Sequence, residues 1–387
     1  MDRREFLADM SLLLAATTVT TGAALAQSPA ANRTRWQVRE SEGFDAISFL
    51  GPLSRNELYL RYYAQDAEAF APRMPQSVSS DIAALSKSAT ADGFGLLGPT
   101  LCVLFSNGND STIDTLLAAL QARDERILPA YRSSPYWDEK GWDWFGRAAA
   151  RLQAIFTAMR DANFAQFRSE RLGADFAARR AEVARALDDF DVVTWQQKLT
   201  GRTFDPTIEI VLLQFSKPHG IKVQGQTFLQ ATDYDTPTTV RIAAHEMLHP
   251  PVTMDGAAAK AALAALARDD LIMKILREHD PRWGYNTLDG LLDEDLVQAL
   301  DQLISEALGV ARNPADRWRK SDDGMHVLAA GFYGLLRQDR WIETGGSIET
   351  WLADAVKRKR LAATSLHPVA ARVLERPVGS LWPLPKA

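Results

Sequence analysis

Apolar residues along most of this chain recur every three or four positions, the spacing that places them on one face of a helix. The pattern holds from about residue 36 to residue 200 and predicts a mostly helical N-terminal half. One clear stripe comprises Ile113, Leu116, Leu117 and Leu120. Residues 142–188 are rich in Ala, Arg, Leu and Phe and contain few helix breakers, so they predict two long amphipathic helices.

The pattern changes near residue 205, where β-branched and apolar residues run together. Residues 207–213 form such a run, and residues 220–225 and 226–229 follow a turn that contains Pro218. Short runs of this kind between turn residues predict a strand pair or a small meander. Helical spacing resumes at about residue 237. We therefore expect a mainly α protein with a small β-sheet, of the α+β class.

Composition and charge are those of a globular protein. Hydrophobic residues make up 46% of the 387 residues, and 44 basic residues nearly balance 49 acidic ones, giving a formal net charge of -5. This charge is too small to indicate a nucleic acid or a membrane surface as partner. The single cysteine, Cys102, lies in an apolar run and predicts a buried thiol. One cysteine excludes a disulfide within the chain and a Cys-rich zinc site.

The first 27 residues have the three parts of a secretory signal: a charged start, an apolar middle, and the small-residue end Ala24–Ala26. The segment Arg3–Leu7 resembles a twin-arginine export signal, although Asp2 and Ala8 depart from the usual pattern. The resemblance implies a bacterial protein exported to the periplasm or secreted. No other segment is long and apolar enough to span a membrane.

A helix near residue 240 is expected to end in a pair of histidines. Asp235 or Thr236 is suited to cap its N-terminus, and Pro237 suits its first turn. No breaker interrupts residues 240–249, and the pair Pro250–Pro251 then ends the helix. We also expect the first of these prolines to distort the last turn.

His245 and His249 lie four positions apart in this helix, so their imidazoles leave the same face about one turn apart. Two such nitrogens can bind one Zn²⁺ ion at about 2.0–2.1 Å. Glu246 lies about 100° around the helix, where its carboxylate can take a proton from a water on the metal. The chain has only six histidines, which makes a chance match rare. The alternative is a pair of buried histidines that only pack.

The HExxH pattern of His245, Glu246 and His249 resembles that of the zincin metallopeptidases. The metzincin form has a Gly and a third His soon after the pattern, whereas the next histidine here is His279. The chain is therefore similar to the glutamate zincins, in which a Glu on a later helix is the third zinc ligand. The resemblance covers the motif, the β segment before it and a downstream helix.

A helix expected at about residues 289–308 carries two candidates for this third ligand, Glu294 and Glu306, which lie about 120° apart around its axis. Glu294 aligns with Gln298 and Asp301, which can form hydrogen bonds behind a ligand, and its surroundings resemble the third-ligand helix of some bacterial zincins. Glu306 lies closer to the apolar stripe of the helix, which argues for it. We favour Glu294 and keep Glu306 as the alternative.

The same resemblance implies two further roles. The segment 220–231 would contain an edge strand that pairs with an extended peptide. His326 and Tyr333, seven positions apart on one expected helix, would act in catalysis by stabilising the oxyanion. The remaining histidines, His219, His279 and His367, are expected at the surface.

These expectations combine into one layout. A signal peptide (1–27) precedes a large helical N-terminal region (28–204), a zincin-like metal-binding core (205–340), and C-terminal helices with a tail (341–387). The expected function is hydrolysis of peptide bonds in a peptide or protein substrate, with Zn²⁺ as cofactor. The alternatives are a zinc-containing binding or assembly protein without turnover, and a zinc hydrolase of a non-peptide amide.

Overall fold

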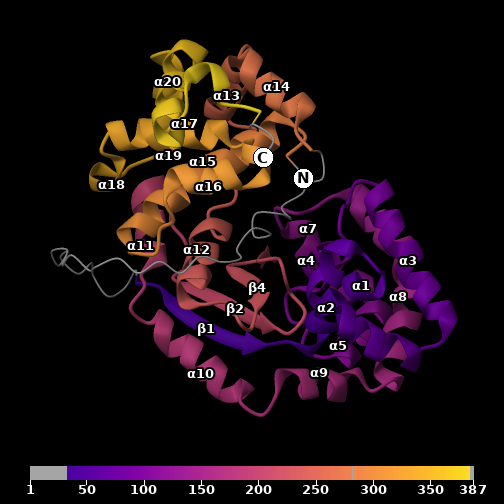
Figure 1. Ribbon diagram of the computed structural model, residues 1–387. Helices are drawn as coiled ribbons and strands as arrows, with labels where there is room; N and C mark the ends of the chain where they lie inside the picture. Colours follow the sequence, from indigo (N-terminus) through magenta and orange to yellow (C-terminus); the bar gives the residue numbers. More distant parts are fainter. Residues whose placement is uncertain (1–32, 281–282, 284, 384–387) are drawn as a thin grey trace.

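The computed structural model describes residues 33–280, 283 and 285–383 (Figure 1). The expected signal peptide at 1–27 lies outside these residues. The described chain is mainly helical with a four-stranded mixed sheet, which confirms the predicted fold class. Within the described residues, no helix is long and apolar enough to cross a membrane.

The N-terminal lobe, defined here as helices α1–α9, is the indigo and purple part of Figure 1. It follows strand β1, Arg35–Glu40, which the helical spacing did not predict. The helices of the lobe are α1 (Glu42–Leu53), α2 (Glu57–Phe70), α3 (Gln76–Ala91), α4 (Leu97–Phe105), α5 (Ile113–Gln121), α6 (Arg123–Arg126), α7 (Leu128–Ser133), α8 (Glu139–Asp161) and α9 (Phe164–Leu172).

The prediction of two long helices within residues 142–188 is wrong, because three helices share this segment. Asn163 adopts a left-handed backbone conformation, φ 60°, between α8 and α9. Gly173, at φ 75°, then separates α9 from α10, Phe176–Leu187. A left-handed residue cannot continue an α-helix, so each of these positions ends one.

The rest of the chain supplies the other strands and the C-terminal lobe, defined here as α12–α20. After α11 (Val192–Thr200) come β2 (Thr207–Leu213), β3 (Ile221–Lys222) and β4 (Thr227–Ala231). The helices of the C-terminal lobe are α12 (Thr236–Glu246), α13 (Ala257–Leu266), α14 (Asp270–Glu278), α15 (Leu288–Ala307), α16 (Pro314–Lys320), α17 (Val327–Gln338), α18 (Trp341–Thr344), α19 (Ile348–Lys357) and α20 (Ala363–Leu374).

The strand order is β1-β2-β4-β3. β1 runs parallel to β2, and β2 runs parallel to β4, while β3 pairs antiparallel with β4. The predicted β segment therefore does contain neighbouring strands, but they do not form a simple meander. The short strand β3 lies at the edge of the sheet, where the expected substrate-binding strand was placed.

The two faces of the sheet contact different hydrophobic cores. Successive side chains of a strand point to opposite faces. Ile210 of β2 and Phe228 of β4 therefore join the buried residues of α12, α15 and α17, which we call the motif core. Val211 and Leu229 join the buried residues of the N-terminal lobe, which we call the N-terminal core. The sheet is thus a wall that both cores share.

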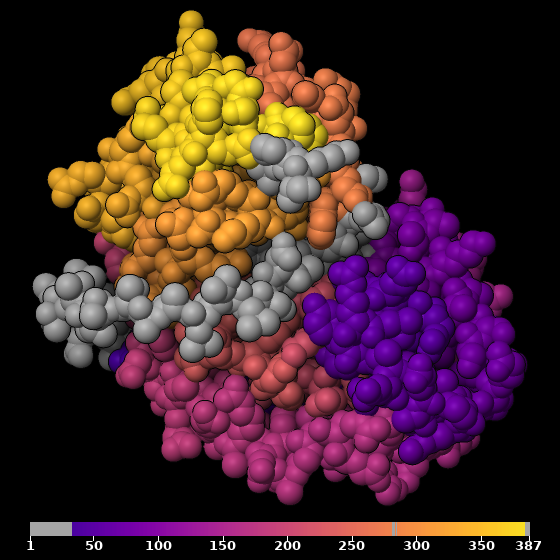
Figure 2. All heavy atoms as spheres, in the orientation of Figure 1, coloured from indigo at the N-terminus to yellow at the C-terminus, as the bar shows by residue number. Residues whose placement is uncertain are grey.

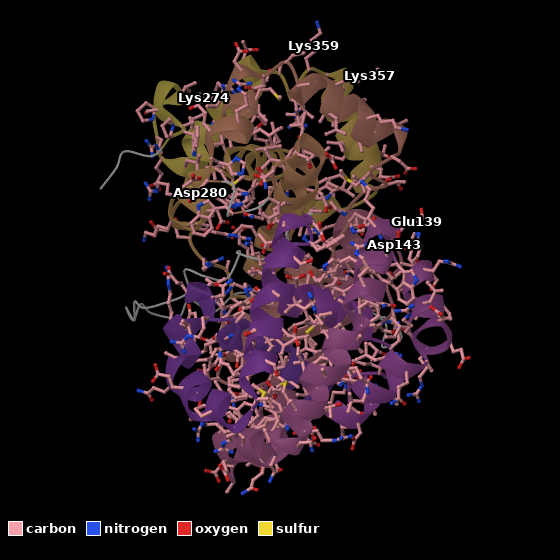
Figure 3. All side chains as sticks on the ribbon, turned by 90° about the vertical axis from the view of Figure 1, so that its right-hand side faces the viewer. Glu139, Asp143, Lys274, Asp280, Lys357 and Lys359 are labelled. Atoms are coloured by element: carbon pink, nitrogen blue, oxygen red, sulfur yellow. The ribbon has the colours of Figure 1, made fainter. Side chains whose placement is uncertain are left out.

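The space-filling view shows the two lobes as separate bulges (Figure 2). The view from the side shows the same division, with the charged side chains of Lys357 and Lys359 at the outer surface of the C-terminal lobe (Figure 3). The region where the lobes meet is therefore the place to look for a cleft.

Candidate metal centre

Helix α12 presents the motif histidines at its C-terminal end. Asp235 caps the helix by accepting a hydrogen bond from the Thr238 amide at 2.8 Å. Pro237 lies in the first turn, where a missing amide donor costs nothing. Both features follow the expectation from the sequence, and they fix where the helix begins.

The C-terminal end of α12 is tighter than a regular helix. The α-helix ends at Glu246, and in the next turn the Leu248 amide donates to the His245 carbonyl oxygen at 3.0 Å. The His249–Pro250 peptide bond is cis. The distortion expected before Pro250 is therefore present, and His249 lies just beyond the regular helix.

Three buried side chains converge beyond this turn. His245 Nε2 and His249 Nε2 lie 3.2 Å apart. Glu294 Oε1 lies 3.5 Å from the first of these nitrogens, and its Oε2 lies 3.5 Å from the second. The three residues are 3%, 6% and 1% exposed, and their ligand atoms all lie within 4.8 Å of one another. This triad can hold a metal ion.

The donor set fits a cation. His245 directs its Nδ1 to Asp301 at 2.7 Å, and His249 directs its Nδ1 to Asp293 at 3.2 Å. A neutral imidazole that donates from Nδ1 is an acceptor at Nε2. Both Nε2 lone pairs and both Glu294 oxygens then face the same small volume. A set of acceptors brought together in this way is satisfied by a positive ion.

The electrostatics of the triad also favour positive charge. Burial lowers the pKa of His245, but the Glu294 and Asp301 carboxylates outweigh burial and raise it. Burial raises the pKa of Glu294, but the two histidines outweigh burial and lower it. The negative field that draws a proton to His245 also stabilises a divalent cation at the same place.

A second set of side chains holds the triad in place. Gln298 Nε2 donates to Glu294 Oε1 at 2.9 Å, and the Trp318 indole donates to Gln298 Oε1 at 2.7 Å. Arg317 forms an ion pair with Asp301, Nη2 to Oδ2 2.9 Å. The sequence singled out Gln298 and Asp301 from their alignment with Glu294. It gave no signal for Arg317 and Trp318, which lie on α16 and reach the site only through the fold.

The structure places Glu294, and not Glu306, beside the two histidines. Glu306 lies at the far end of α15, where it accepts hydrogen bonds from the Tyr333 hydroxyl at 2.6 Å and from Arg337 at 2.9 Å. The apolar stripe of α15, which favoured Glu306, does not indicate which side chains face the histidines. Helix α15 is buried on every side between Gly290 and Ser305, so its polar residues face inward as well.

His326 and Tyr333 both lie on or beside α17, but they do not join the triad. The His326 ring lies between Asp295 Oδ1, at 2.5 Å from Nδ1, and Asp322 Oδ2, at 2.9 Å from Nε2. Burial lowers the pKa of His326, but Asp295 and Asp322 outweigh burial and raise it to about 10. Tyr333 donates to Glu306. The catalytic roles suggested for this pair stay predictions.

The expectation that the other histidines lie at the surface is wrong for two of them. His219 is 3% exposed and His279 is 5% exposed. His367 is partly buried and contacts Asp269 at 2.7 Å. His219 and His367 lie where long-range contacts cover them, such as the Tyr59 ring against His219. The residues next to a histidine in the sequence do not predict contacts of this kind.

Tyr285 is a contact of the triad that the sequence did not indicate. It is 5% exposed, its backbone is left-handed at φ 55°, and its hydroxyl forms a hydrogen bond with Glu294. Its ring also packs edge-on against His326, with 5.7 Å between the ring centroids. Burial raises the pKa of Tyr285, and the Glu294 carboxylate raises it further, so the hydroxyl stays a donor.

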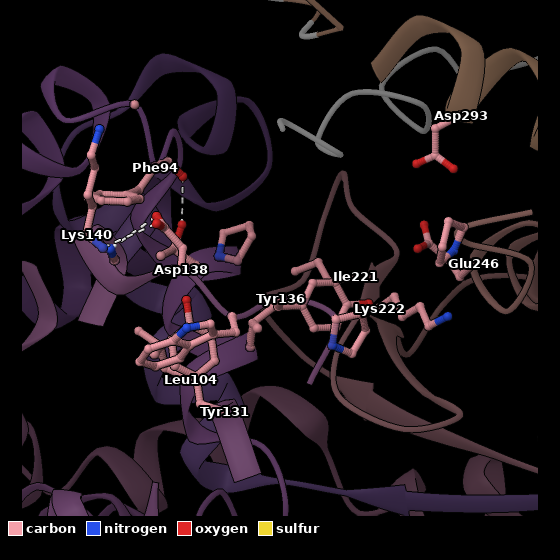
Figure 4. A pocket seen from close by; sticks show the side chains of 18 of the residues that line it. Phe94, Leu104, Tyr131, Tyr136, Asp138, Lys140, Ile221, Lys222, Glu246 and Asp293 are labelled. Carbon is pink, nitrogen blue, oxygen red and sulfur yellow. Dashed lines mark hydrogen bonds between the residues drawn. The ribbon is translucent and has the colours of Figure 1, made fainter. Parts of the chain in front are cut away.

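A cleft between the lobes reaches Glu246, but none of the three candidate ligands lines it (Figure 4). The cavity has a volume of about 640 Å³, and Glu246 and Asp293 line one end of it. Ile221 and Lys222 of β3 line its middle, and the Lys222 ammonium donates to the His249 carbonyl oxygen at 3.1 Å. Glu246, the residue expected to act as base, therefore borders the cavity although it is only 5% exposed.

Comparisons with protein-family models, with curated proteins and with solved structures find no match for this chain. The functional assignment therefore depends on the geometry of the site itself.

Proposed function

We propose that this protein is a zinc-dependent metallopeptidase, in which His245, His249 and Glu294 hold the metal and Glu246 is the general base. The observation that carries the proposal is the placement of Glu246 at the end of a cleft, directly beside a buried ligand triad. Two imidazoles and one carboxylate form a ligand set of catalytic zinc sites. The HExxH spacing and the later Glu also resemble the glutamate zincins.

In the proposed hydrolysis, the metal and the residues around it have different roles. Zn²⁺, when bound, supplies a Lewis acid that polarises a carbonyl and lowers the pKa of water. Glu246 takes the proton of the attacking water and passes it to the leaving amine. Asp301 and Asp293 accept from the Nδ1 atoms and so hold each ring with Nε2 as the acceptor.

A peptide substrate is favoured by the strand that borders the cleft. β3 is the edge strand of the sheet, and its two residues, Ile221 and Lys222, line the cavity. The backbone of an extended peptide can pair with such an edge. A peptide paired with β3 would run along the cavity toward Glu246.

The test is a comparison of wild type with Glu246→Gln. Zinc content is measured by elemental analysis, and hydrolysis of a defined peptide mixture is followed by mass spectrometry. We expect unchanged zinc content and a fall in rate of about 10²- to 10⁴-fold, the usual contribution of a general base. Glu278→Gln, at an exposed position on α14, is the matched control. Equal rates for wild type and Glu246→Gln would overturn the mechanism.

The burial of the triad favours one second candidate, a zinc-containing binding or assembly protein without turnover. All three candidate ligands are at most 6% exposed. Wild-type protein that contains zinc but cleaves no peptide would support this candidate, and cleavage of other amides alone would point to a non-peptide hydrolase.

We also propose export to the periplasm or secretion, on the strength of residues 1–27. Cell fractionation of the full chain and of an Arg3→Lys, Arg4→Lys variant tests this.

A further inference from the structure

The cleft has an aromatic end that the hydrolytic chemistry does not use. Phe94, Leu104 and Tyr131 lie at the end opposite Glu246 (Figure 4). Tyr136 and Trp137 line the cavity as well. All of these residues belong to the N-terminal lobe. The two ends of one cavity therefore come from different lobes. Glu246 and Asp293 line the motif end, whereas the N-terminal lobe contributes aromatic rings together with Asp138 and Lys140.

The aromatic end is held rigid by its own contacts. The rings of Tyr131 and Trp137 meet edge to face, with 5.3 Å between centroids, and the Arg132 guanidinium lies over the Trp137 ring at 5.1 Å. Asp138 caps α8 by accepting from the amides of Lys140 and Gly141 at 3.2 and 3.1 Å, which fixes the segment just before it. A preformed apolar wall binds a ligand without a large cost of ordering.

The connection between the two ends has the shape of a peptide path. Ile221 and Lys222, at the edge of the sheet, lie between the aromatic end and Glu246 (Figure 4). A peptide paired with this edge would be extended, so alternate side chains would point to the same side. A scissile bond at Glu246 would then leave another side chain of the same peptide at the aromatic end.

We propose, on the basis of the function proposed above, that the aromatic end is the subsite that selects the substrate. It takes a bulky apolar or aromatic side chain of an extended peptide. The lining of the cavity as a whole is mostly apolar, and its volume of about 640 Å³ leaves room for a peptide that carries such a side chain. Peptides with a small side chain at this position are poor substrates, because they leave the apolar part of the wall exposed to water.

The probes are alanine-based peptides in which a single residue is Phe, Leu, Asp or Lys at successive positions. Wild type should cleave the Phe and Leu peptides with a kcat/KM about 10- to 100-fold above the all-alanine peptide at one position only. Trp137→Ala should lower kcat/KM for the Phe and Leu peptides more than for the all-alanine peptide, and it should keep the zinc content of wild type. Val103→Phe, which adds a ring to the lining of the cavity, should exclude the Phe peptide.

The control is Tyr62→Ala, which removes a ring that is 38% exposed on α2 and does not line the cavity. This variant should keep the preference. Titration calorimetry of the same peptides with Glu246→Gln measures binding without hydrolysis. It separates the proposed subsite from the proposed peptidase activity. Selective binding of the Phe peptide without hydrolysis by wild type retains the subsite and removes the peptidase. Hydrolysis with no preference among the peptides, or an equal loss on all peptides in Trp137→Ala, overturns the subsite.

Discussion

The two cores meet at one sheet but are built from different kinds of residue. The N-terminal core centres on a group of aromatic rings, and Phe49 alone packs against four of them with centroid distances of 4.3–5.8 Å. The motif core encloses charged and polar side chains along α15. These are Asp293, Glu294, Asp295, Gln298, Asp301 and Gln302.

The difference shows where stability has been traded for a site that can hold a metal ion. A buried charge is costly to desolvate, and a well-packed apolar group in its place often stabilises a protein by about 1–4 kcal/mol. The N-terminal core is mostly of the apolar kind. The motif core keeps its carboxylates, and those at Glu294 and Asp301 lie in direct contact with His245. A metal ion bound at the triad would explain why these carboxylates are buried, whereas packing alone does not explain it.

The largest effect is expected at the ligand of α15. Glu294→Gln keeps the shape of the side chain but removes its charge, and should weaken zinc binding by about 10³-fold or more, since each ligand supplies a large share of a binding free energy on the order of 10 kcal/mol. Glu306→Gln on the same helix is the control and should bind zinc as wild type does. Competition with a chromophoric chelator measures both. Equal weakening in the two variants would mean that Glu294 is no ligand.

The second-largest effect is expected in the stability of the N-terminal core. Phe49→Ala leaves a cavity among the rings and should lower the free energy of unfolding by about 3–5 kcal/mol. Urea denaturation followed by tryptophan fluorescence measures this loss. Zinc affinity below the unfolding transition should not change, because the ring lies on the other side of the sheet from the triad. A loss of zinc affinity in folded Phe49→Ala would show that the two cores are not separate.

A smaller effect should appear as a pH dependence in the motif core. His326 has a pKa raised to about 10 by Asp295 of α15 and Asp322, against the effect of burial. The unfolded chain releases this proton near pH 6.5, so the contribution is complete below that pH and declines as the pH rises through about 10. The difference in unfolding free energy between wild type and His326→Gln should therefore shrink by about 2–4 kcal/mol between pH 7 and pH 10.5. Urea titrations with and without chelator measure it, and a constant difference would contradict the assignment.

The smallest effect is expected at the start of the motif helix. Asp235→Ala removes the cap of α12 and should lower the free energy of unfolding by about 1 kcal/mol. Asp235→Asn, which can still cap, should lose much less. Thermal unfolding of the three proteins makes the comparison. Equal losses in Asp235→Asn and Asp235→Ala would mean that the charge, rather than the cap, matters.

The local part of the site could be predicted from the sequence. The cap at Asp235 and the four-residue spacing of His245 and His249 act within one helix, so the sequence alone places both rings on one face. Glu294 was found by a resemblance and by its alignment with Gln298 and Asp301. The apolar stripe of the same helix favoured Glu306 instead. In a helix that is buried on all sides, the stripe does not indicate which side chains face the site.

The non-local part could not be predicted in the same way. β1 is a short strand that pairs only with β2, far along the chain, and nothing next to it in the sequence indicates that partner. The burial of His219 and His279, the ion pair of Arg317, and the contact of Tyr285 with Glu294 also depend on segments brought together by folding. The cleft is the clearest case, since its two ends come from different lobes.

The pairing of β1 with β2 also has a consequence for synthesis of the chain. Arg35 and Thr207 are register partners although 172 positions separate them. While the ribosome is still adding the residues between them, the N-terminal helices have no sheet to close against, and the side of their core that the sheet covers stays exposed to solvent. Such distant pairings form slowly. We therefore expect the nascent protein to need protection from aggregation until its second strand has emerged.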